Sequence, residues 1–196
     1  MNALHHWFDE TYHEEVLLSD GTQATVHLIR PADKDVLSAG FQRLSAQSRF
    51  TRFFTSKPAL SAGELRFLTE IDGENHVALG AWRRRPDGTV EGLGVARFVR
   101  LPEDPSKAEP AVAVVDDWQG RGLGRALLAR LVGAAREREV SEFQCTVLAY
   151  NQPMLSILRA LPGATFRQRS DTVDVSIDLD TESSNALVIS FVPRPA

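Results

Sequence analysis

A glycine-rich segment between an apolar run and an amphipathic stretch is the part of this sequence best suited to chemistry. It reads Val-Ala-Val-Val-Asp-Asp-Trp-Gln-Gly-Arg-Gly-Leu-Gly-Arg over residues 112–125. Glycine lets the backbone turn sharply and approach a ligand closely, and the start of a helix presents unpaired N–H groups at the positive end of the helix dipole. The segment therefore predicts a site where backbone amides bind a diphosphate.

Two arginines in this segment could strengthen such a site. Arg121 and Arg125 supply fixed charge and fork-shaped donors that suit phosphate oxygens. The P-loop pattern does not fit, because no Lys-Ser/Thr pair follows the glycines, and the Rossmann pattern does not fit, because its third glycine would stand at position 125. A helix start that uses small residues only for packing remains the alternative.

Other kinds of reactive site find less support. No His-Glu-x-x-His or Cys/His pattern indicates a metal, so we expect none. No Gly-x-Ser-x-Gly element indicates a serine nucleophile. The single cysteine, Cys145, falls in an apolar run and is typical of an inert core thiol.

Hydrophobic periodicity and turn signals predict the elements that must position the glycine-rich segment. We expect strands at residues 25–29, 76–82, 90–99, 111–115 and 143–149, two more within 165–179, a polar loop at 101–108, and helices at 31–45, 61–69, 122–139 and 151–161. Ser61 is the expected N-cap of the second helix, with Glu64 at the capping-box position. The order predicts an α/β fold of the mixed α+β kind, with a mostly antiparallel central sheet and flanking helices.

Three regions follow from these patterns. Residues 1–22 lack clear periodicity and form an N-terminal lead-in, residues 23–180 form one domain, and residues 181–196 form a C-terminal extension. Within that extension, residues 187–189 could add an edge strand. A chain of 196 residues buries enough surface to fold without a metal or disulfide.

Composition excludes several classes of protein. The formal net charge of −4 gives no reason to expect a broad basic face or a nucleic-acid partner. No apolar run approaches the roughly 18 residues of a membrane span, so we expect no membrane partner. One cysteine suits a reducing compartment. We therefore expect a cytoplasmic protein, which could form a homo-oligomer.

The glycine-rich segment resembles the signature of the GNAT superfamily of acyl-CoA-dependent N-acyltransferases, Gln/Arg-x-x-Gly-x-Gly/Ala. The signature stands here as Gln119, Gly120, Arg121, Gly122, Leu123 and Gly124. The order of elements over residues 23–179 is similar as well, so the resemblance implies the GNAT fold for the predicted domain and acetyl-CoA as cosubstrate. It also implies that the segment 119–125 binds the CoA diphosphate, that main-chain groups of Val112 and Val114 bind pantetheine and the thioester, and that Asn151 contacts pantetheine while capping its helix.

Shorter matches along the chain are similar to bacterial protein lysine acetyltransferases of the Pat type. They lie at residues 48–54 (Ser-Arg-Phe-Thr-Arg-Phe-Phe), 94–98, 108–109, 116–122 and 147–151. This closer resemblance implies an enzyme that transfers acetyl to a lysine side chain of a protein. Acetyl-CoA synthetase is the acceptor that it suggests.

Glu109 matches the position of the catalytic glutamate in Pat-type enzymes, and the resemblance makes it the expected general base. A free lysine amine has a pKa of about 10.4 and is mostly protonated near neutral pH, so something must accept its proton. A carboxylate could do so through water. Spacing alone favours a solvated loop carboxylate near Glu103 and Asp104, and the resemblance reverses that preference.

Two positions depart from the family pattern. Pro110 stands where relatives more often carry an ordinary apolar residue, and it lacks the N–H that a strand residue donates, so its effect on Glu109 is open. Leu158 stands where many GNAT enzymes have a tyrosine that protonates the leaving thiolate. The resemblance therefore implies that this acid is absent here.

Two other functions fit the same residues. An N-acetyltransferase with a small amine or amino acid as its acceptor would share the cofactor segment. A non-catalytic acyl-CoA-binding sensor would keep Gly120 to Gly124 and transfer nothing, although the presence of Glu109 argues against it.

Overall fold

Eight strands form a single sheet in residues 7–180, the part of the chain that the computed structural model describes. Their order across the sheet is β1-β2-β3-β4-β5-β6-β8-β7. Neighbouring strands run antiparallel except β5 and β6, which are parallel. The mixed α/β fold with a mostly antiparallel sheet is thus confirmed.

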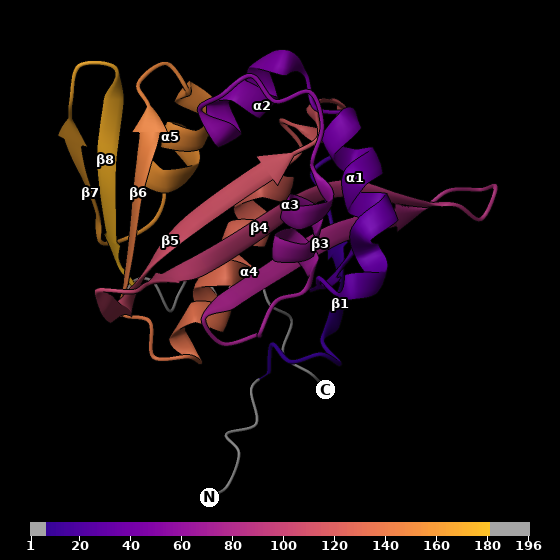
Figure 1. Ribbon diagram of the computed structural model, residues 1–196, viewed down its shortest axis with the longest axis horizontal. Coiled ribbons are helices and arrows are strands. Elements are labelled where there is room, and N and C mark those ends of the chain that lie inside the picture. Colours follow the sequence, from indigo (N-terminus) through magenta and orange to yellow (C-terminus); the bar gives the residue numbers. More distant parts are fainter. Residues whose placement is uncertain (1–6, 181–196) are drawn as a thin grey trace, which may run out of the picture.

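Five α-helices of the described residues pack against this sheet. The strands are β1 (His13–Leu17), β2 (Gln23–Leu28), β3 (His76–Arg84), β4 (Val90–Leu101), β5 (Asp104–Val114), β6 (Glu142–Leu148), β7 (Ala164–Gln168) and β8 (Thr172–Asp178), and the helices are α1 (Lys34–Gln42), α2 (Ala46–Phe53), α3 (Ala62–Thr69), α4 (Leu123–Arg136) and α5 (Gln152–Arg159). In Figure 1, α1, α2 and α3 lie on one face of the sheet and α4 lies on the other. Among residues 7–180, no helix combines the length and apolar character needed to cross a membrane.

Two segments differ from the sequence-based expectation. The predicted loop over residues 101–108 is mostly strand, because β5 starts at Asp104, which pairs with Leu101 of β4, and continues to Lys107 and Ala108, which pair with β6. Helix α2 occupies a stretch where periodicity predicts no helix, and Ser45 caps it by accepting a hydrogen bond from the Ser48 N–H. The predicted edge strand at residues 187–189 lies outside the described residues.

Residues ahead of the predicted domain also contribute to the sheet and the core. β1 pairs with β2 at one edge, and Phe8, Tyr12 and Val16 are buried. Glu14 of β1 accepts from the Nε and Nη2 of the buried Arg130 of α4, the former at 2.7 Å. The sequence of β1 lacks the alternation of apolar and polar residues that indicates a strand, because one of its inward-facing residues is this charged glutamate.

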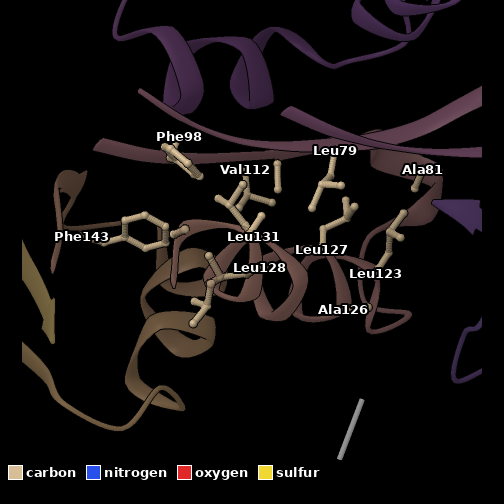
Figure 2. Close-up of a cluster of buried hydrophobic side chains, with 14 of the residues drawn as sticks. Leu79, Ala81, Phe98, Val112, Leu123, Ala126, Leu127, Leu128, Leu131 and Phe143 are labelled. Atoms are coloured by element: carbon tan, nitrogen blue, oxygen red, sulfur yellow. The ribbon is translucent and has the colours of Figure 1, made fainter. Parts of the chain in front are cut away.

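Helix α4 contributes much of the main hydrophobic core. Figure 2 shows Leu123, Leu127 and Leu131 of α4 packed beneath Leu79 and Phe98 of the sheet. All five side chains are at most 1% exposed. Because this packing fixes the helix against the sheet, it also fixes the place where the helix begins.

Candidate active site

β5 and β6 separate soon after they meet. Only Lys107 and Ala108 of β5 pair with β6, after which the two strands diverge (Figure 1). A cleft of about 1110 Å³ extends along this divergence. It is lined by all the predicted site residues: Glu109, Val112, Val114, Gln119, Gly120, Arg121, Gly122, Leu123, Gly124, Arg125 and Asn151.

Alternate residues of β5 turn their main-chain groups toward this cleft. The Val115 N–H donates to the Leu93 carbonyl of β4 at 2.9 Å, so by the antiparallel register Ala113 also bonds to β4. The main-chain groups of Val112 and Val114 consequently point away from β4, toward the gap. These are the groups that the resemblance assigns to pantetheine.

Pro110 lies on the same side of β5 as these valines. Its nitrogen faces β6, where the next parallel hydrogen bond after Ala108 would form, and proline has no N–H to donate. The pairing of Glu109 with Val99 continues through this point, and the register shift in this hairpin lies instead near Arg100. The proline therefore leaves Glu109 in a regular strand and favours the separation of β5 from β6.

The glycine-rich loop presents a run of free amides to the cleft. Among residues 7–180, the backbone N–H groups of residues 120–125 have no acceptor. Gly120 and Gly122 have φ values of +72° and +83°, left-handed conformations that glycine adopts without strain. Successive free amides at the positive end of a helix are suited to bind an anion.

The two arginines of the loop differ in their surroundings. Arg121 forms an ion pair with Asp20 at 2.5 Å and stacks on the ring of Trp118, 4.6 Å from its centroid. Arg125 is exposed and forms no ion pair or hydrogen bond within the described part of the chain. Of the two, Arg125 is the cation left for an anionic ligand.

The Gln119 side chain bonds within the protein. Its Nε2 donates to the Val114 carbonyl at 3.0 Å and to Ser48 Oγ at 3.3 Å. Ser48 Oγ and the Ser45 N–H in turn donate to the carboxylate of Asp116, at 3.0 and 2.9 Å. Burial would raise the pKa of Asp116, but these hydrogen bonds outweigh it and lower the pKa. The network ties α2 to the loop, and sequence reasoning missed it because no local pattern signals partners so far apart.

Glu109 stands where the two strands part. Its side chain is exposed and forms no hydrogen bond or ion pair with any residue between 7 and 180. Across the gap lies Cys145 of β6, which also lines the cleft. Burial, and then the charge of Glu109, raise the pKa of the Cys145 thiol to about 12, so this thiol is protonated at neutral pH. Cys145 is therefore not available as a thiolate base, and Glu109 is the exposed carboxylate beside it.

Helix α5 closes the far side of the cleft. Asn151 caps it as predicted, with Oδ1 accepting from the Met154 N–H at 3.3 Å. Leu158 is buried in the cleft wall, so this position offers no hydroxyl. Tyr150 also lines the cleft and is 53% exposed.

Comparison with known proteins places the chain among acetyltransferases. The model of the Acetyltransferase (GNAT) family matches residues 40–161. An acetyltransferase of Pseudomonas aeruginosa is 27% identical over 87% of this chain and 87% of its own length. Acetyltransferase Pat of Mycolicibacterium smegmatis is 28% identical over 77% of this chain, which spans 44% of that protein. The crystal structure of the GNAT domain of S. lividans PAT superposes with a TM-score of 0.75, at 30% identity over 85% of this chain and 96% of that domain.

A buried histidine lies on the same face of the sheet as Glu109. His76 of β3 is opposite Val99 of β4, which is opposite Glu109, and residues paired in this way point to one face. The Nε2 of His76 lies 2.9 Å from an Nη atom of Arg97, which donates to it. Burial, and then the charge of Arg97, lower the pKa of His76 to about 4.

This histidine predicts how stability changes with pH. Its folded pKa of about 4 lies below the ordinary 6.5, so the unfolded chain binds more protons between these values. The contribution of neutral His76 to the free energy of unfolding is complete above pH 6.5 and is lost as the pH falls toward 4. At pH 5 this loss amounts to about 2 kcal/mol. Urea denaturation should therefore show that the free energy of unfolding falls less between pH 7 and pH 5 in His76→Gln than in the wild type. The difference between the two proteins should be about 2 kcal/mol. Equal losses in the two proteins would contradict the prediction.

Proposed function

Because the chain belongs to the GNAT family of acetyltransferases, we propose that it transfers acetyl from acetyl-CoA to the side-chain amine of a lysine in a protein, with Glu109 as general base. The observation that carries this proposal is the cleft itself. Glu109, the outward main-chain groups of β5 and the free amides of residues 120–125 all line it. We propose residues 23–180 as the catalytic domain, with β1 added to the edge of its sheet.

The cleft has the groups that acetyl-CoA needs. The diphosphate would accept hydrogen bonds from the amides of residues 120–125, and Arg125 would offset its charge. Pantetheine, which carries amide groups, would pair with Val112 and Val114 as an added strand. Asn151 would meet the same arm from α5. Gln119 would act indirectly, by holding the loop through the Val114 carbonyl.

The reaction balances with Glu109 as the base. The acceptor ammonium loses one proton to solvent, and the neutral nitrogen attacks the acetyl carbon. A carbon–nitrogen bond forms, the carbon–sulfur bond breaks, and the second amine proton passes through water to the Glu109 carboxylate. CoA leaves as a thiolate and takes its proton from solvent, since Leu158 offers none. Exposure of Glu109 lets it return its proton to water.

Two observations favour a protein as the acceptor. The relatives include proteins named Pat, and the mouth of the cleft carries large exposed aromatic side chains. Phe54 and Tyr150 line the cleft and are 47% and 53% exposed. Aromatic side chains that are exposed in the free protein are typical of surfaces that bind another protein.

Labelled acetyl-CoA tests the acceptor. The protein is incubated with a cell extract that has been separated into proteins and small molecules, with purified acetyl-CoA synthetase as a further sample, and modified sites are located by mass spectrometry. We expect the label on lysine side chains of proteins. Label in small molecules alone would reassign the acceptor to a small amine. Binding of acetyl-CoA with no label in any sample would indicate a sensor.

Glu109→Gln tests the base. Loss of general base catalysis should lower kcat by about 10²- to 10⁴-fold, while the Kd for acetyl-CoA, measured by calorimetry, stays unchanged. Glu103→Gln is the matched control, because Glu103 is exposed in the turn between β4 and β5. Turnover that is unchanged in Glu109→Gln would remove this residue from the mechanism.

Gly122→Ala tests the loop. A Cβ at Gly122 meets no atom within 4 Å, so its effect comes from the φ of +83°, which alanine adopts at a cost of roughly 1–2 kcal/mol. We expect the loop to relax and CoA to bind about tenfold more weakly in calorimetry. Gly88→Ala in the β3–β4 turn carries the same φ of +83° and the same open space. Gly88→Ala should lose a similar free energy of unfolding but keep the full affinity for CoA. Equal affinities for CoA in Gly122→Ala and Gly88→Ala would contradict a role of the loop in binding CoA.

A further inference from the structure

Arg52 of α2 lies near Glu109 but forms no ion pair with a carboxylate of the described residues. Its side chain lines the cleft and is only partly exposed. Within residues 7–180 it forms no ion pair or hydrogen bond, and its guanidinium carbon lies 5.0 Å from the centroid of the Phe53 ring. Burial lowers its pKa, and the charge of Glu109 opposes that shift. A partly desolvated guanidinium without a paired anion is costly, which makes this position a candidate for ligand binding.

A second arginine lies on the same face of the sheet. Arg97 of β4 is opposite Ala111 of β5, which is two residues from Glu109. The side chains of Arg97 and Glu109 therefore leave the sheet on the same face, the one that carries α2 (Figure 1). Arg97 is 5% exposed. It donates to the Leu68 carbonyl at 3.3 Å and to His76 at 2.9 Å, and both of these acceptors are neutral at physiological pH.

The two arginines carry an excess of positive charge. Burial, and then the charge of Arg52, lower the pKa of Arg97 to about 9. Asp72, the acidic residue that acts on His76, is held by backbone N–H groups of its own turn, including that of Glu74 at 2.9 Å. Glu109 therefore acts on Arg52, and Arg52 in turn acts on Arg97. Neither guanidinium group has an ion-pair partner among the described residues.

A small pocket joins these arginines. It measures about 70 Å³, lies between the sheet and helices α1 to α3, and has both Arg52 and Arg97 in its lining. Because Arg52 also lines the main cleft, it stands at the boundary between the two spaces. The other walls include the apolar Phe41, Leu60 and Val95. A single water needs only about 10–15 Å³, so the pocket has room for a group of a few non-hydrogen atoms such as a carboxylate.

We propose that Arg52, with Arg97 behind it, forms a carboxylate subsite beside Glu109 and binds a carboxylate that the acceptor carries close to its reacting amine. This inference rests on the proposed function, because it names the class of acceptor for the same cleft. A guanidinium pairs with a carboxylate through two parallel hydrogen bonds, which would fix the acceptor's orientation as well as its charge. The carboxylate could belong to an acidic residue next to the lysine of a protein or to a free amino acid.

Matched acceptors test the subsite. Three peptides carry one lysine preceded by Glu, Gln or Arg, and Nα-acetyllysine is compared with its amide, which lacks the carboxylate. We expect kcat/KM for the Glu peptide to exceed that for the Gln peptide by about tenfold, and the Arg peptide to be poorest. The peptides report on a protein source of the carboxylate, and the lysine derivatives report on a free amino acid.

Variants of Arg52 link the preference to this side chain. In Arg52→Gln the ratio of the Glu to the Gln peptide should fall to within about twofold, and in Arg52→Lys it should be intermediate, because lysine keeps the charge but not the fork. Arg66→Gln, an exposed arginine of α3 outside both pockets, is the control and should keep the full ratio. Circular dichroism verifies that each variant is folded.

The outcomes separate this inference from the proposed function. If the wild type uses all peptides and both lysine derivatives equally well, the subsite is wrong and the proposed function stands. A uniform loss on every acceptor in Arg52→Gln would also overturn the subsite and would assign Arg52 to support of Glu109. Acetylation of Nα-acetyllysine in preference to its amide, with no peptide modified, would keep the subsite and contradict the protein acceptor. If nothing is acetylated, both proposals fail.

Discussion

The unpaired edge of β5 is the constraint on which the rest of this structure depends. A strand inside a sheet needs partners for its N–H and C=O groups on both sides, and unmet groups are costly unless solvent or a ligand reaches them. From Ala108 onward β5 pairs with β4 without interruption, but its pairing with β6 ends at Ala108. Pro110 supplies no donor for the next bond. The main-chain groups of Val112 and the N–H of Val114 face an open cleft, while the Val114 carbonyl accepts from Gln119 Nε2. The surface that we propose for the cofactor is thus built from main chain, which depends little on side-chain identity.

In the proposed binding mode one cofactor spans the edge of β5 and the free amides of residues 120–125. These two sets of main-chain groups must therefore keep a fixed relative position. Packing of Leu123, Leu127 and Leu131 against the sheet sets the start of α4, and with it the amides of residues 120–125. The hydrogen bonds among Ser48, Asp116 and Gln119 then join α2 to the same loop. A displacement of the loop would therefore also displace α2, the helix that carries Arg52. Arg52 is the residue that we propose to bind the acceptor. Exposed and partly buried hydrogen bonds thus connect the proposed cofactor and acceptor regions.

Local interactions account for what could be predicted. The capping box of Ser61 and Glu64, the N-cap at Asn151 and the β3–β4 hairpin all form within a few residues, and the structure contains each of them. β1 could not be recognised, because Glu14 points inward to an arginine of α4 and breaks the expected alternation. The first half of β5 looked like a loop, because its residues are mostly polar. Its strand character comes from partners distant in the sequence or across a turn: Asp104 pairs with Leu101 of β4, and Lys107 and Ala108 pair with β6.

The sequence by itself determined the class of fold, the glycine-rich entry into α4 and, through its resemblance to a known family, the candidate base Glu109. Tertiary structure alone decided that β5 and β6 part beside Pro110, that the Gln119 side chain serves the protein's own framework, and that Arg52 lies near Glu109 without an ion-pair partner among the described residues. The physical reason is the range of the forces involved. Turns, caps and periodic faces arise between neighbours in the chain, whereas the charge balance and the free edges of a site depend on which distant segments pack together.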